Sequence, residues 1–199
     1  MRYVYVKTEI QKEKFSKIII HICSSHFINT VKLKVFALFN KKQTLARLLS
    51  VRLISFMVHC VSLNEADFYF TKIILILGSE NEIEGFEKML QTLIRILEID
   101  KNIEVDDPID MEDCPFEEEK KLCNDAEKRR SPYYIYFHQK KKEIFETSTF
   151  TNKKNKLFNK LLLNYFMDFL FVYFPLWSRV LISSLNMKRD RNATAENNL

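Results

Sequence analysis

The sequence predicts a mainly helical protein with a few strands. The chain of 199 residues has only two glycines and four prolines, so the tight turns that β-rich folds need are scarce. Apolar residues recur at helical spacing through most of residues 24–98. With 47% hydrophobic and 29% charged residues, the chain can bury one sizeable core.

Two strands are expected near the N-terminus. Residues 2–7 (RYVYVK) alternate between apolar and polar side chains, which is typical of a strand with one covered face. Residues 17–23 (KIIIHIC) form a continuous apolar run, which favours a strand covered on both faces. We expect a basic N-terminal segment over residues 1–16 and a strand plus helical region over residues 17–100.

Four helices are expected to follow these strands. Ser24 and Ser25 offer an N-cap for the first helix, and a second helix is expected over residues 45–60. The sequences SLNE at 62–65 and SENE at 79–82 match the capping box, so they are expected to open the third and fourth helices. Each helix has one apolar face, so the four must pack together to bury it.

An acidic loop is expected over residues 101–132, because residues 101–127 carry eleven acidic side chains against three basic ones. A C-terminal helical segment is expected over residues 133–199. Within it, residues 133–138 (YYIYFH) favour a short strand, which a lysine-rich linker joins to an apolar helix over residues 161–177.

The apolar run at residues 161–177 could be taken for a membrane span. It contains Asn164 and Asp168 near its middle, and an ionised carboxylate there costs roughly 3 kcal/mol to insert. The run also falls short of the ~20 residues that a spanning helix needs. We therefore expect a buried core helix, with membrane anchoring as the alternative.

The charge distribution of the chain bears on its binding partners, and its cysteines bear on its cellular compartment. Residues 1–60 carry a net charge of +9 and residues 128–160 one of +8, so both ranges are expected to bind a polyanion such as DNA. Ordinary solvated helix faces would give the same composition, and this alternative stays open. The four cysteines are widely spread and no signal peptide precedes them, which indicates an intracellular, reducing setting.

Cys23 and His26 form a Cys-x-x-His motif at the end of the apolar run. A zinc site needs four ligands and normally a second pair at similar spacing. His59 and Cys60 are adjacent, so on a helix their side chains diverge by about 100° and do not supply that pair. Spacing alone therefore favours a buried strand end, with Cys23 as a small hydrophobic residue and His26 in the first helical turn.

The order of these motifs resembles the distal part of the catalytic domain of a Mutator-like element (MULE) transposase. In that family an apolar strand leads into a Cys-x-x-His motif, matched here by Cys23 and His26, and a largely helical insertion follows. A Pro-Leu-Trp segment, matched up to Trp177, then precedes an Asn-x-x-x-Glu motif, matched by Asn192 and Glu196.

The resemblance, over roughly residues 17–199, implies the remnant of an RNase H-like α/β catalytic fold with a helical insertion, and a nuclear location. In the intact family two aspartates and a glutamate hold two Mg²⁺ ions, roughly 4 Å apart. Glu196 matches the third acid, as catalytic residue and metal ligand, although a solvated acid in a polar tail is equally open. No aspartate occurs before Asp67, where the family has two. We therefore expect a truncated fragment that binds no metal ion by itself.

Two functions from other classes stay open. Residues 43–98 would suit a small helical interaction protein with an exposed apolar face, and such a chain would self-associate. The basic ranges 1–60 and 128–160 would suit nucleic-acid binding without catalysis.

The purified chain is expected to leave a labelled DNA duplex intact in the presence of Mn²⁺, because a single carboxylate cannot hold two divalent ions. A nicking assay on the wild-type chain and on the Glu196→Gln variant measures this directly. Strand breakage by the wild type that disappears in the variant would contradict the expectation.

Overall fold

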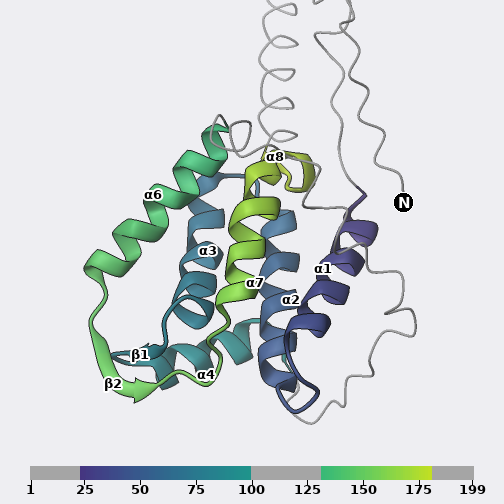
Figure 1. Cartoon of the computed structure of the whole chain (residues 1–199). Coiled ribbons are helices and arrows are strands. Elements are labelled where there is room, and N and C mark those ends of the chain that lie inside the picture. Colours follow the sequence, from purple (N-terminus) through teal and green to yellow (C-terminus); the bar gives the residue numbers. More distant parts are fainter. Residues whose placement is uncertain (1–22, 100–130, 181–199) are drawn as a thin grey trace, which may run out of the picture.

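The computed structural model describes residues 23–99 and 131–180, and in these ranges the fold is mainly helical, as the sequence predicts (Figure 1). These ranges contain seven α-helices and one two-stranded sheet. The strand predicted at residues 2–7, nearly all of the strand at residues 17–23 and nearly all of the acidic loop lie outside the described residues.

The first three predicted helices are confirmed. They are α1 (Ser24–Leu38), α2 (Thr44–His59) and α3 (Leu63–Leu77), and each contacts the next. Ser62 caps α3 as predicted, because its Oγ accepts a hydrogen bond from the Glu65 amide at 3.2 Å, and the Glu65 carboxylate accepts one from the Val61 amide at 2.9 Å. Apolar side chains from all three helices are fully buried, and they include Val31, Val35, Leu49, Leu53, Met57, Phe70, Ile73 and Ile74.

Arg47 ties the start of α2 to the end of α1 from a buried position. Its Nη2 donates to the carbonyl oxygens of Phe36 at 3.0 Å and Phe39 at 2.7 Å, and its guanidinium lies 4.6 Å from the centroid of the Phe36 ring. The last carbonyls of a helix have no partner within the helix, so a buried helix end needs such a donor. Arg47 is therefore a structural cap and not part of a basic surface.

The fourth helix begins later than predicted. Residues Asn81–Ile83 form strand β1, and α4 spans Phe86–Ile96. Ser79 Oγ donates to the carbonyl oxygen of Asn81 at 2.8 Å, which makes a turn and not a helix N-cap. Gly85 then has φ 72°, in the left-handed region that glycine adopts without a steric penalty, and the helix starts directly after it. The prediction of a helix start at Ser79 is wrong.

Strand β1 pairs antiparallel with β2 (Phe150–Lys154), with Ile83 opposite Phe150. Asn155 extends this junction, because its Nδ2 donates to the carbonyl oxygens of Ile76 at 2.8 Å and Ser79 at 2.9 Å. The expected lysine-rich linker is therefore partly a strand. It fixes the connection after α6 to the connection between α3 and α4.

Residues 133–138 are helical, and the prediction of a strand is wrong. They belong to α6 (Pro132–Thr147), where Ser131 Oγ accepts a hydrogen bond from the Tyr134 amide at 3.4 Å. Pro132 suits the first turn because no intrahelical partner exists there for an N–H group. Phe137 is fully buried whereas Ile135 is 54% exposed, so the helix has a narrow buried face.

The apolar run at residues 161–177 is buried as predicted, but it is not one regular helix. It consists of α7 (Lys160–Tyr165), a π-helical turn η3 (Phe166–Leu170), a 3₁₀ turn η4 (Phe171–Tyr173) and α8 (Phe174–Trp177). Asn164 is exposed and Asp168 is half-buried, so neither enters the core. Over residues 23–99 and 131–180, no helix combines the length and apolarity that a membrane crossing needs.

Replacement of Arg47 by alanine is expected to lower the free energy of unfolding by about 2–3 kcal/mol, because two buried carbonyls lose their donor. Arg47→Lys is expected to recover little, since an ammonium group cannot reproduce the forked contact with both carbonyls. Urea unfolding followed by circular dichroism measures the change. Arg52→Ala is the matched control, because Arg52 lies exposed on the same helix. Equal losses in the two alanine variants would contradict the assignment.

Candidate functional site

The structure brings the Cys-x-x-His segment and the Pro-Leu-Trp segment together. Phe27, the residue after His26, stacks on Trp177 with ring centroids 4.6 Å apart and ring planes at 14°. Trp177 is buried, and its indole nitrogen donates to the carbonyl oxygen of Leu170 at 2.8 Å. Two motifs that are far apart in the sequence therefore form one corner of the molecule, where α8 is fastened to the start of α1.

Cys23 lies exposed at the N-terminal end of α1, so the prediction of a buried hydrophobic cysteine is wrong. His26 lies in the first turn of α1, as predicted, and is also exposed. The His26 amide, the His26 side chain and the Ser25 amide lower the pKa of the Cys23 thiol to about 7, because they stabilise the thiolate. Burial instead raises the pKa of Cys60 to about 11.

The other residues of the predicted catalytic motif, Asn192 and Glu196, lie outside the described residues. In residues 23–99 and 131–180, no group of three or more His, Cys, Asp and Glu side chains could hold a metal ion. Within this part of the chain the structure therefore supports neither a zinc site at Cys23 and His26 nor a cage for a pair of Mg²⁺ ions.

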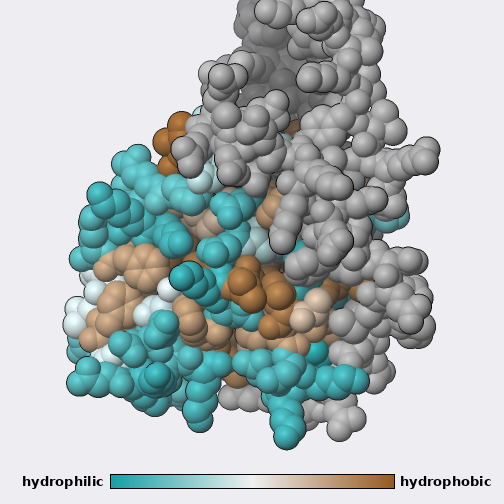
Figure 2. All heavy atoms as spheres, viewed as in Figure 1, coloured by the Kyte–Doolittle hydropathy of each residue, from teal (hydrophilic) through white to brown (hydrophobic). Residues whose placement is uncertain are grey.

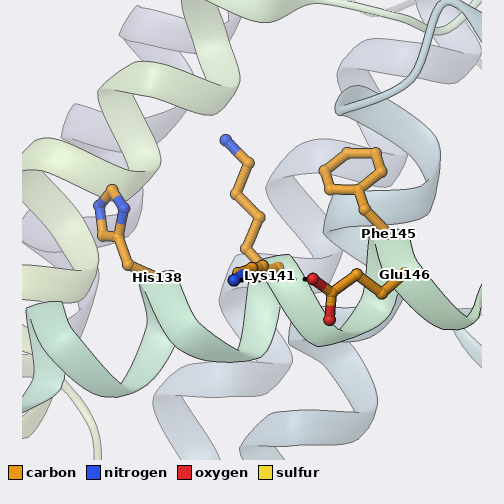
Figure 3. A pocket seen from close by; sticks show the side chains of 5 residues that line it. His138, Lys141, Phe145 and Glu146 are labelled. Atoms are coloured by element: carbon orange, nitrogen blue, oxygen red, sulfur yellow. Dashed lines mark ion pairs between the residues drawn. The ribbon is translucent and has the colours of Figure 1, made fainter.

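A second candidate site lies along α6, where His138, Lys141 and Phe145 project from the same side of the helix (Figure 3). Together with Lys142 and Glu146 they line an open pocket of about 430 Å³. The spacing of three and four residues places the first three side chains on one helical face. This signal was present in the sequence, but it was missed because the segment was interpreted as a strand and a linker.

The pocket offers an ammonium group beside apolar surface. Burial lowers the pKa of His138, Asp168 opposes this shift, and Lys141 adds to it. The His138 ring packs on Tyr134 with centroids 3.9 Å apart, and its buried Nε2 has no hydrogen-bond partner among the described residues. Burial also lowers the pKa of Lys141, Asp168 opposes this shift, and Lys160 adds to it. The pocket therefore places an imidazole with a lowered pKa beside the Lys141 amine, and the Asp168 carboxylate is close enough to affect the pKa of both groups.

The lysines around this pocket divide into two groups. Seven lysines lie between residues 140 and 160, and hydrophilic side chains gather over the α6 and β2 side of the molecule in Figure 2. Three of them form ion pairs: Lys140 with Asp67 and Glu143, Lys142 with Glu146, and Lys153 with Glu82. The other four make no ion pair with a described carboxylate, and we name them the free lysine set: Lys141, Lys154, Lys156 and Lys160.

The Asp67 carboxylate has two partners, a hydroxyl that donates hydrogen bonds to it and an ammonium group that forms an ion pair with it. Tyr136 Oη donates to its two carboxylate oxygens at 2.8 Å and 2.7 Å, and Lys140 Nζ lies 3.6 Å from Oδ2. Burial is the main cause that raises the pKa of Tyr136, and the hydrogen bond to Asp67 adds to it. This network joins α3 to α6. It also pairs Lys140, one lysine of the basic range 128–160, with a carboxylate of the fold.

The basic range at residues 1–60 is also reduced by the fold. Lys34 is only 5% exposed, and its Nζ lies 4.6 Å from the centroid of the Tyr165 ring. Arg47 is buried at the junction of α1 and α2. Among the described residues of this range, the exposed basic side chains include Lys41, Lys42 and Arg52. The net charge of the sequence therefore overstates the basic surface on α1 and α2.

Cys23 is expected to react with iodoacetamide with a midpoint near pH 7, because the thiolate is the reacting species. The His26→Ala variant is expected to move this midpoint upward, towards the ordinary value of 9.0. Mass spectrometry of the chain with Cys114→Ser and Cys123→Ser separates the labelling of Cys23 from that of buried Cys60, the internal control. An unchanged midpoint on unfolding in urea would contradict a role for the helix start.

Comparisons of the chain with protein-family models, with curated proteins and with solved structures find no match. The functional assignment therefore rests on the residues and contacts of this chain.

Proposed function

We propose that this protein binds nucleic acid without cleaving it and is related to Mutator-like transposases. The observation that carries the binding proposal is the free lysine set, which lies on α6, at the end of β2, in the turn after β2 and at the start of α7. Ammonium groups without a carboxylate partner contact phosphate oxygens and release the counterions condensed on the nucleic acid. The ligand class is therefore the sugar–phosphate backbone, which such contacts bind without reading its sequence.

The pocket on α6 supports this ligand class. Lys141 extends from it, and Asp168 and Lys160 both lie close enough to affect the pKa of Lys141, so two lysines and one carboxylate share this region. Phe145 lies on the same face of α6, and an aromatic ring beside lysines offers a stacking surface to an unpaired base. The pocket is thus compatible with an unpaired nucleotide next to the phosphate contacts.

The relationship to Mutator-like transposases is supported by the corner at which Phe27 stacks on Trp177. The two family-like segments, one with Cys23 and His26 and one ending at Trp177, are in contact there through these rings. An RNase H-like ancestry and a nuclear location are part of the same proposal. The described residues do not fit a pair of Mg²⁺ ions, so no catalytic step is derived from them.

A second candidate function is protein interaction through α3 and α4. It is favoured by two exposed apolar side chains, Phe68 at 46% and Ile96 at 42% exposure. In this case the groove between the two helices, and not the free lysine set, would be the principal surface.

Replacing the four members of the free lysine set by glutamine is expected to weaken binding to a labelled duplex oligonucleotide and to reduce the slope of log K against log salt by about 3.6 units, since each phosphate contact contributes roughly 0.9. Fluorescence anisotropy at several salt concentrations measures the slope. The matched control is Lys88→Gln with Glu84→Gln, which changes two exposed side chains outside this pocket and leaves the net charge unchanged. A slope that is flat in the wild type, or equal in all three proteins, would exclude the proposal.

A further inference from the structure

A groove of about 400 Å³ runs between α3 and α4, on elements that do not carry the free lysine set. Phe68 and Lys72 line it from α3, one turn apart, and Lys88, Thr92, Leu93 and Ile96 line it from α4. The residues on α4 span eight positions, which corresponds to about 12 Å of helix, or roughly two turns. The groove is therefore long enough for two turns of a further helix.

The floor of the groove is apolar and open to solvent. Phe68 and Ile96 are two of the five large hydrophobic side chains that are exposed among the described residues. Leu93, by contrast, is buried and joins this surface to the core. Apolar side chains that gather in a hollow, and are not scattered singly, are typical of an interaction site.

Two lysines border this floor. Lys72 Nζ lies 5.4 Å from the centroid of the Phe68 ring, and burial lowers the pKa of Lys72. Neither Lys72 nor Lys88 forms an ion pair with a described carboxylate. A half-buried ammonium group without a counter-charge is stabilised when a carboxylate approaches it. The charge of the groove therefore complements an acidic ligand.

We propose that the α3–α4 groove binds an acidic amphipathic helix of another protein. Its apolar side chains, repeating every three to four residues, would pack on Phe68, Leu93 and Ile96, and its carboxylates would face Lys72 and Lys88. A symmetric second copy fits less well, because a two-fold axis through the groove would bring the lysines of both copies towards one another. This interaction is independent of the proposed nucleic-acid binding.

The test uses the full-length chain and a labelled designed helix of about 18 residues, roughly five turns, with leucine at every third or fourth position and glutamate elsewhere. A scrambled peptide of the same composition is the control ligand. We expect anisotropy to show binding of the designed helix and none of the scrambled peptide. Phe68→Ser or Ile96→Ser is expected to lower the affinity for the designed helix about tenfold or more, which corresponds to about 1.4 kcal/mol.

A charge swap keeps the test informative if a groove variant folds poorly. The Lys72→Glu, Lys88→Glu double variant is expected to lose the glutamate helix and to bind a helix in which lysine replaces glutamate. A misfolded chain would bind neither peptide. A failure of the swap in a variant with a native circular dichroism spectrum would overturn the proposal, as would equal binding of the scrambled peptide.

Two other occupants would also overturn it. If the designed helix binds only after the acids of residues 104–113 are changed to amides, the groove belongs to the acidic stretch of this chain. If sedimentation shows a dimer that Ile96→Ser converts to a monomer, the groove belongs to a second copy.

Discussion

The described part of the fold depends on the ring of Phe171, because its contacts connect four elements of the core. It packs against Phe70 of α3, Phe137 of α6, Phe166 of η3 and Trp177 of α8, with centroids between 4.8 Å and 6.4 Å apart. Each such pair contributes about 0.5–1.5 kcal/mol beyond the burial of its area. In Figure 1 the segment from α7 to α8 accordingly lies between α6 and α1. Through Phe137 this cluster fixes α6, which carries the pocket, and through Trp177 it fixes the corner next to Cys23 and His26.

The irregular helix at residues 160–177 has a physical reason in its aromatic spacing. Phe166 and Phe171 are five residues apart, across the π-helical turn, and Phe174 and Trp177 follow at intervals of three, through and after the 3₁₀ turn. On a regular α-helix, residues five apart differ by about 140° around the axis, so the two phenylalanines could not share one face. The change of helix type lets all four rings be buried.

Elements that depend on interactions between residues close in the sequence were predicted correctly, whereas elements that depend on distant residues were not. The helices α1, α2 and α3 were predictable because their apolar stripes and the cap at Ser62 are local signals. The start of α4 was not, because β1 exists through its pairing with β2, which lies far away in the sequence. Helix α6 was misread because an aromatic run has high β-propensity, and the core contact of Phe137 overrides that preference.

The same distinction governs the candidate sites. The lysines of residues 128–160 were evident from composition, but the partners that neutralise Lys140 and Lys153 come from α3 and β1, so only the fold separates paired from free lysines. The two proposed surfaces, the free lysine set and the α3–α4 groove, would both bind a negatively charged ligand. They differ, however, in one physical respect. The proposed binding of the sugar–phosphate backbone by the free lysine set would rest mainly on charge, so salt should weaken it steeply. The α3–α4 groove adds the apolar floor of Phe68 and Ile96, whose contribution salt does not screen, so binding there should persist where binding of a polyanion is lost.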